Sequence, residues 1–180
     1  MTAISLDGRS LAQQALVEVK ERITALAPIL GQPPCLAVVQ VGADPASAAY
    51  VRQIERTAAR VGVTVAVHVI DGSSSVDEAA GLVARLCADS GVQGLIVQQP
   101  LPKQVPLDAL IAVLNPLKDI DGLHPYNVGL LALGRADAIV PATPLGGLEI
   151  LRRSGLPVSG QHAVIVGRSP IVGRPLASLL

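Results

Sequence analysis

The strongest constraint on the fold of this chain is the alternation of helical segments with strand-length runs along residues 11–114. Three runs rich in apolar or β-branched residues, at 35–41, 63–70 and 94–97, have the length and composition of buried β-strands. Segments with helical periodicity lie around them, at 11–26, 45–61, 77–88 and 107–114. The alternation predicts an α/β fold in which helices cover both faces of a parallel sheet.

Glycine, proline and capping residues mark the expected ends of these elements. Gly42 closes the first strand and Gly62 stops the helix that begins at Pro45, for which Asp44 or Ser47 is the expected N-cap. Pro28 is expected to end the first helix near its C-terminus. The boundaries of the first half of the chain are therefore well specified.

The second part of the chain follows a different pattern. Residues 116–143 are rich in Pro, Gly, Asp and Asn and read as a domain crossover. We then expect a helix over 144–153 with Thr143 as N-cap, a buried strand over 161–166 and a helix from about Ile171. Because one parallel strand needs neighbours, 162–180 is expected to be the first unit of a second domain whose remainder is absent. Either the sequence is a fragment of a longer protein or the chain is a truncated product. The expected domains are 1–118, a crossover over 119–143, and the beginning of a second domain over 144–180.

Composition excludes several classes of function. Lys plus Arg and Asp plus Glu balance at 14 each, so no bulk charge favours nucleic acid or an anionic membrane as a partner. The N-terminus does not resemble a signal peptide and no apolar run is long enough to span a bilayer, which predicts a cytoplasmic protein. Cys35 and Cys87 have no metal-ligand spacing and are expected to be buried free thiols, so we predict no metal site.

Two polar loops follow apolar runs and predict a small-molecule site. The first, 98–102, comes directly after the strand 94–97, and the second covers 119–129. In open α/β sheets the binding cleft lies at the carboxyl ends of the strands. Asp121 in the second loop is either a capping carboxylate or a partner for the N–H edge of a heterocycle, and His124 is more typical of a structural residue than of a base.

Two further features allow both a structural and a functional interpretation. Tyr50 is either a packed amphipathic aromatic, the favoured interpretation for the residue alone, or a platform that stacks on a flat ligand. Residues 164–175 form a strand, a glycine turn and a helix start, which is either an ordinary turn or a phosphate site. At that turn Arg168 and Ser169 suit an additional 2′-phosphate.

Taken together, five ordered blocks of sequence resemble the bifunctional methylenetetrahydrofolate dehydrogenase/cyclohydrolase family over nearly the whole chain. The blocks are 42–47 with Tyr50-Val51, 94–98 with 100–102, 118–122 with His124-Pro125, Asn127 and Gly129, then Pro141 with Thr143-Pro144, and 167–169 with 172–175. The resemblance implies a three-layer, parallel-sheet catalytic domain and the beginning of a Rossmann-type NAD(P)-binding domain, truncated at its first βα unit.

The resemblance also implies an activity in one-carbon metabolism, associated with purine biosynthesis. Hydride would pass from the methylene group of 5,10-methylenetetrahydrofolate to NADP, and water would then open the methenyl cation to 10-formyltetrahydrofolate. Family members usually form dimers through the cofactor domain, so a homodimer is expected of the full-length form.

Site residues are implied position by position. Tyr50 matches the aromatic that stacks along the folate, Gln98 the amide that supports the catalytic lysine, and Asp121 the carboxylate that holds the pterin ring. Pro100 and Leu101 belong to the same substrate side. The positions expected to receive NADP are Gly167, Arg168, Ser169, Val172 and Gly173. The preference for NADP over NAD rests on Arg168 and Ser169 alone.

The sequence departs from the family pattern at one decisive position. Ile54 stands where the family has its catalytic lysine, one helical turn after Tyr50, while Arg56 replaces a usual lysine and Ala142 a common cysteine. Ile54 has no ionisable atom, so we expect cyclohydrolase activity to be severely reduced or absent, whereas hydride transfer needs apposition more than a proton carrier. The alternative is a non-catalytic folate-binding pseudoenzyme with a regulatory or interaction role. A plain dinucleotide-binding module leaves both polar loops unexplained.

Overall fold

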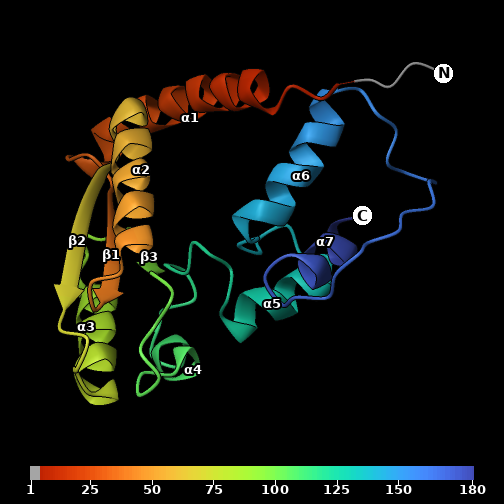
Figure 1. Ribbon diagram of the computed structural model, residues 1–180. Coiled ribbons are helices and arrows are strands. Elements are labelled where there is room, and N and C mark those ends of the chain that lie inside the picture. The colour runs from red at the N-terminus through yellow and green to blue at the C-terminus, as the bar shows by residue number, and fades with distance from the viewer. Residues whose placement is uncertain (1–4) are drawn as a thin grey trace. The chain divides into compact units, whose positions relative to one another are not determined.

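The computed structural model describes residues 5–180, which divide into two compact units (Figure 1). The first unit is Leu16–Ile120, and the second combines the residues up to Ala15 with Asp121–Leu180. Helix α1 (Gly8–Leu30) contributes residues to both. Pro28 lies inside this helix, which ends at Leu30, two residues later than the proline suggested.

A three-stranded parallel sheet forms the centre of the first unit. Its strands are β1 (Cys35–Val41), β2 (Thr64–Ile70) and β3 (Gly94–Val97), in the order β2-β1-β3. In register, Val38 on the central strand lies beside Val67 on β2 and Ile96 on β3. The expected strands are confirmed, with β2 beginning one residue later than predicted.

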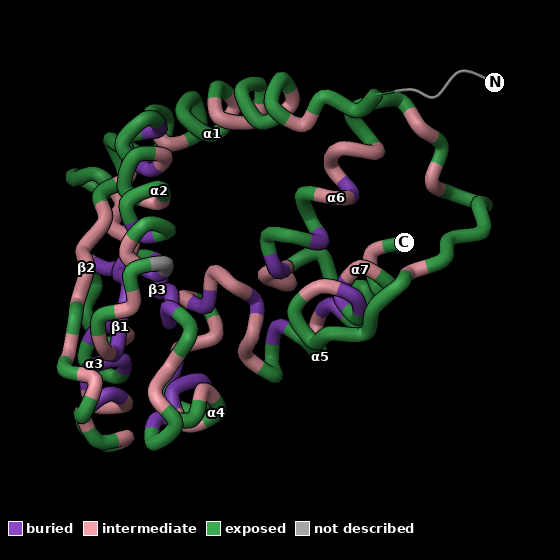
Figure 2. The backbone as a smooth tube through the Cα atoms, viewed as in Figure 1, coloured by how far each residue is buried: buried purple, intermediate pink, exposed green. Residues whose placement is uncertain are grey.

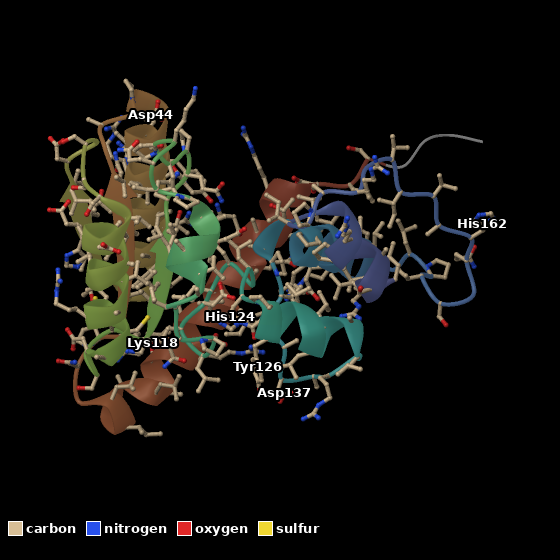
Figure 3. The ribbon with its side chains drawn as sticks, turned by 90° about the horizontal axis from the view of Figure 1, so that it is seen from below. Asp44, Lys118, His124, Tyr126, Asp137 and His162 are labelled. Carbon is tan, nitrogen blue, oxygen red and sulfur yellow. The ribbon has the colours of Figure 1, made fainter. Side chains whose placement is uncertain are left out.

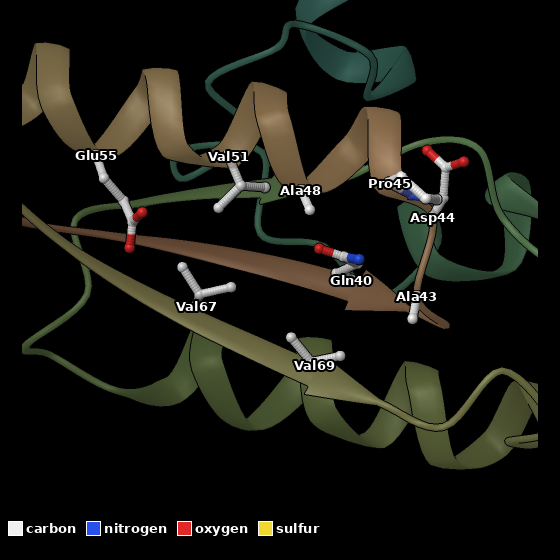
Figure 4. Close-up of a pocket in the computed structure, with 9 residues that line it drawn as sticks. All are labelled: Gln40, Ala43, Asp44, Pro45, Ala48, Val51, Glu55, Val67 and Val69. Carbon is white, nitrogen blue, oxygen red and sulfur yellow. The ribbon is translucent and has the colours of Figure 1, made fainter.

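Helices cover both faces of this sheet, as the alternation predicted. Helix α2 (Pro45–Val61) lies on one face and α3 (Val76–Ala88) on the other (Figure 4). The short helix α4 (Leu107–Ile111) packs against α3. The apolar core is built without aromatic rings: Val38, Val51 and Ile96 form a buried cluster between α2 and the sheet. Figure 2 shows the buried positions of this unit concentrated on β1, β3 and the inner side of the helices.

Local hydrogen bonds explain where the helices of the first unit begin and end. Asp44 Oδ2 accepts a hydrogen bond from the Ser47 backbone N–H at 2.7 Å, so Asp44 is the N-cap of α2. Gly62 ends α2 with φ = 85°, a conformation that glycine adopts without a Cβ penalty. Lys118 Nζ donates to the carbonyl oxygen of Asp89 at 2.6 Å, just beyond the C-terminus of α3 (Figure 3).

The second unit is helical. It contains α5 (Pro125–Ala132), α6 (Ala142–Arg153) and α7 (Gly173–Leu179), with α7 in contact with both others. Helix α5 lies inside the segment that we expected to be an irregular crossover. Helix α6 begins two residues before the predicted start, so Thr143 is inside the helix and Pro141 occupies the N-cap position.

The prediction of a buried strand over 161–166 is wrong. These residues are irregular, and the Val164 and Val166 side chains are 80% and 99% exposed. A strand requires backbone partners, and none of the described strands pairs with this segment. The following helix begins at Gly173 rather than near Ile171.

Two other expectations concern cysteines and membrane spans. Cys35 and Cys87 are free but half-buried rather than buried, and the Cys87 sulfur accepts a hydrogen bond from the Asn115 backbone at 3.2 Å. Among residues 5–180, no helix has both the length and the apolarity that crossing a bilayer requires.

Candidate active site

The start of α2, which follows β1, is joined by a hydrogen bond to the loop after β3 at the carboxyl end of the sheet. The chain passes from β1 to β2 on one side and then returns to β3 on the other, so the strand order reverses at β1. Ser47, which is 4% exposed on the first turn of α2, donates its hydroxyl to the Gln99 carbonyl oxygen at 3.1 Å. This reversal point is where open α/β sheets place their ligands.

Gln98 is the first residue after β3 and is buried. Its backbone N–H donates to the Val39 carbonyl oxygen at 2.8 Å, and its Nε2 donates to the Gln99 carbonyl oxygen at 2.6 Å. The Gln99 oxygen thus accepts from both Gln98 and Ser47. The next peptide bond, Gln99–Pro100, is cis. Pro100 is exposed and Leu101 half-buried in the loop that follows.

Tyr50 and Ile54 line one apolar pocket of about 420 Å³ between α2 and α1. Other lining residues include Leu16 and Val19 from α1. Tyr50 is 60% exposed, so the interpretation of this residue as a packed core aromatic is wrong. An exposed ring at the rim of an apolar pocket is free to stack on a flat ligand.

Ile54 belongs to the packed side of the same helix. It is half-buried and contacts the buried cluster of Val38, Val51 and Ile96. The position one turn after Tyr50 is therefore filled by hydrocarbon that continues the core. Arg56 is exposed and does not line the pocket. The described residues that line this pocket include no Lys, His, Asp, Glu or Cys.

Asp121 and its neighbours belong to the second unit and are described within it. Asp121 is half-buried, and Gly122 adopts φ = 64°. A Cβ added at Gly122 would lie 2.6 Å from the Ile139 carbonyl oxygen and 2.9 Å from the Pro141 nitrogen. The position after Asp121 therefore requires glycine, and the backbone that carries the carboxylate is held against 139–141.

His124 has a structural role, as its position suggested. Its Nδ1 accepts a hydrogen bond from the Tyr126 backbone N–H at 3.1 Å and so caps α5 (Figure 3). Asn127, in the same polar segment, is 2% exposed, and its Oδ1 accepts a hydrogen bond from the Ile139 backbone N–H at 3.4 Å. A buried asparagine three residues after the cap was detectable only as part of the ordered motif.

The glycine turn at 167–173 is compact and carries one exposed arginine. Gly167 has φ = 144°, and a Cβ on Gly173 would lie 2.5 Å from the Gly167 carbonyl oxygen. Ser169 Oγ accepts from the backbone N–H groups of Val172 at 3.1 Å and Gly173 at 3.4 Å. The Arg168 guanidinium remains exposed, so a phosphate group has access to it.

Comparison with known proteins assigns both parts of the chain. The family model for the tetrahydrofolate dehydrogenase/cyclohydrolase catalytic domain matches residues 6–121, and the model for its NAD(P)-binding domain matches residues 141–180. The bifunctional protein FolD of Sorangium cellulosum is 43% identical over the whole chain, and that of Chloroflexus aggregans is 46% identical. The chain spans 63% of the length of each of these relatives.

Solved structures show the same fold. The bifunctional FolD dehydrogenase/cyclohydrolase of Campylobacter jejuni superposes with a TM-score of 0.93 at 37% identity, covering 97% of this chain and 61% of that one. The Trypanosoma brucei enzyme, solved with NADP cofactor and an inhibitor, superposes with a TM-score of 0.91 at 32% identity, covering 99% of this chain and 61% of that one. The chain therefore belongs to the tetrahydrofolate dehydrogenase/cyclohydrolase family.

Proposed function

We propose that the protein carrying this chain is an NADP-dependent methylenetetrahydrofolate dehydrogenase whose cyclohydrolase activity is impaired. The observation that carries the proposal is the exposed Tyr50 ring, three residues along α2 from the Ser47 hydroxyl that binds the loop after β3. A stacking surface beside a fixed polar loop suits a flat heterocycle with hydrogen-bonding edges.

Each substrate-side residue has a proposed role. Tyr50 stacks along the folate, Gln98 presents its amide carbonyl to the pterin region, and Asp121 holds the N–H edge of the pterin ring. The Gln98 amide is oriented in advance, because its Nε2 is already bonded to the Gln99 carbonyl oxygen at 2.6 Å. Pro100 and Leu101 complete the substrate side. Positioning of this kind is the protein's main contribution to hydride transfer.

The glycine turn fits one phosphate group of NADP. The exposed Arg168 guanidinium has the donor geometry for a 2′-phosphate, and the backbone at Gly167 leaves more than 4 Å of open space where a Cβ would stand. Ser169 supports the turn by accepting from the N–H groups of Val172 and Gly173. When bound, the nicotinamide accepts the hydride.

The hydrolytic step is the part that Ile54 compromises. Opening the methenyl group requires proton transfer to and from water, and the side chain at this position is a half-buried hydrocarbon. General acid–base assistance is typically worth about 10²–10⁴-fold, which is the loss that we propose here. Hydride transfer moves no proton and is not affected in the same way.

A non-catalytic folate-binding protein with a regulatory role is the second candidate, and Ile54 is the observation that favours it. The two differ in one measurement, which is NADP-dependent turnover of 5,10-methylenetetrahydrofolate by the native protein. Turnover supports the dehydrogenase, whereas folate binding without turnover supports the second candidate.

For the native protein we also propose a cytoplasmic location and a homodimer. We propose that residues 1–118 form the folate side, which 119–143 joins to a nucleotide side that begins at 144.

The two tyrosines of the chain provide a matched test of the folate side. Both are exposed, Tyr50 by 60% and Tyr126 by 50%, but only Tyr50 lines the pocket beside α1. We expect Tyr50→Ala to weaken binding of 5-formyltetrahydrofolate by about tenfold in titration calorimetry, and Tyr126→Ala to leave it within about twofold. Equal affinities of the two variants would rule out the proposed stacking role.

A further inference from the structure

A second cavity of about 460 Å³ lies on a different side of α2 from the Tyr50 pocket. Its walls are apolar: Ala48 and Val51 from α2, and Val67 and Val69 from β2 (Figure 4). The two pockets share no lining residue. This cavity is therefore not explained by the proposed folate site.

Gln40 on β1 brings a hydrogen-bond acceptor into the cavity. It is 7% exposed, and its Nε2 donates to the Gly42 carbonyl oxygen at 2.9 Å. A carboxamide presents its oxygen opposite to its nitrogen, so Oε1 is turned inward, toward Val51 and Val67 (Figure 4). Among the described residues, no donor is bonded to this oxygen. Every buried side-chain N or O atom among the described residues has a hydrogen-bond partner, so this oxygen is open to the cavity, where it can accept from a ligand.

Negative charge lies at both ends of the same cavity. The Glu55 side chain extends from α2 over Val67, and Asp44 lies at the start of the helix (Figure 4). Asp44 is occupied with capping α2, whereas no ion pair joins Glu55 to any cation within residues 5–180. The residues that line the cavity include no Lys, Arg or His. Its electrostatic character therefore favours a cation.

We propose that this cavity binds a small organic cation that joins an ammonium or amidinium group to an apolar body. The apolar body would lie on the valine and alanine side chains, the charged group would pair with the Glu55 carboxylate, and an N–H would donate to Gln40 Oε1. The combination of an apolar wall and a few convergent polar groups is typical of small-molecule sites. A simple metal ion is disfavoured because most of the lining is hydrocarbon.

Benzylamine, which is a cation at neutral pH, is a suitable probe, and benzyl alcohol is its uncharged match. We expect titration of the ¹⁵N-labelled 180-residue chain with benzylamine to shift the Gln40 side-chain amide and the backbone amides of Val67 and Val69. Benzyl alcohol is expected to bind about fivefold more weakly, and added salt to reduce the difference. Equal affinities of the two probes, or shifts scattered over all surface carboxylates, would overturn the proposal.

Single substitutions distinguish binding in this cavity from nonspecific attraction of the cation to surface carboxylates. Glu55→Gln should weaken benzylamine binding by about fivefold, whereas Glu21→Gln, which removes an exposed carboxylate of α1, should not change it. Gln40→Met keeps the side-chain volume and should also weaken binding. An equal effect of Glu21→Gln and Glu55→Gln contradicts the site. Because Gln40 and Glu55 do not line the Tyr50 pocket, binding of 5-formyltetrahydrofolate reports on the proposed function separately.

Discussion

Ser47 on α2 donates its hydroxyl to the carbonyl oxygen of Gln99 at 3.1 Å, across 52 residues of sequence. This bond joins the beginning of α2 to the loop after β3, and the same carbonyl oxygen accepts from Gln98 Nε2. Tyr50 on α2 and Gln98 after β3, two of the residues proposed to contact the folate, therefore belong to segments that are bonded to each other. The proposed site depends on this connection for its geometry.

Removal of the Ser47 hydroxyl tests that connection. Ser47→Ala leaves the backbone cap from Asp44 intact but removes one buried hydrogen bond, which is expected to lower the free energy of unfolding by about 1 kcal/mol. Urea denaturation measures this change. Ser90→Ala, at an exposed serine whose hydroxyl makes no hydrogen bond in the described structure, is the control and should leave the midpoint unchanged. Equal midpoints for both variants would show that the Ser47 bond contributes nothing to stability.

Comparing alanine substitutions at Gly122 and Gly134 distinguishes the cost of backbone strain from the cost of steric overlap. They have nearly the same φ, 64° and 66°, but an added Cβ meets the Ile139 oxygen at 2.6 Å at Gly122 and nothing within 4 Å at Gly134. Gly134→Ala should cost about 1–2 kcal/mol from its conformation alone. Gly122→Ala should cost more, because the backbone at 139–141 must also move. Thermal unfolding of both variants gives the comparison, and an equal loss would contradict the close packing at Gly122.

The pKa of Asp71 is lowered by hydrogen bonds from Ser73. The Ser73 hydroxyl and then its backbone N–H hold the pKa of this exposed carboxyl below its ordinary value of 3.8. A lowered folded-state pKa gives a contribution to stability that is present above 3.8 and is lost as the pH falls through the folded-state value. Ser73→Ala should raise the pKa of Asp71, measured by NMR titration of its carboxyl carbon. Ser74→Ala is the control, and an unchanged pKa in Ser73→Ala would contradict the assignment.

The sequence predicted the first unit well because its boundaries are chemically marked. Gly42 and Gly62 end β1 and α2 at the predicted residues, and Asp44 begins the helix by the capping bond expected of an aspartate. When an apolar run is bounded by such residues, the first and last residues of the strand or helix can be predicted closely. The site residues on this unit could be named from the ordered motifs, but the Ser47–Gln99 bond is a long-range contact that no local pattern contains.

The second unit was less predictable, for physical reasons that differ between segments. Helix α5 is short, and its N-cap is His124, a residue that is not a strong capping signal, so its Pro and Gly content read as a crossover. Residues 161–166 have the composition of a strand, but strand formation depends on a neighbouring strand and not on propensity alone. The sequence pattern indicates the strand propensity of these residues but not whether a neighbouring strand is present to pair with them.

Ile54 is proposed to disable the hydrolytic step, and replacing it with lysine in the native protein tests this claim. We predict that this variant hydrolyses 5,10-methenyltetrahydrofolate about 10²–10⁴-fold faster than the unmodified protein. The loss of methenyl absorbance with time measures the rate. Gln53→Lys, which adds the same charge at the adjacent position lining the same pocket, should give no gain. A folded Ile54→Lys variant that binds folate without faster hydrolysis, or rapid hydrolysis by the unmodified protein, would contradict the claim.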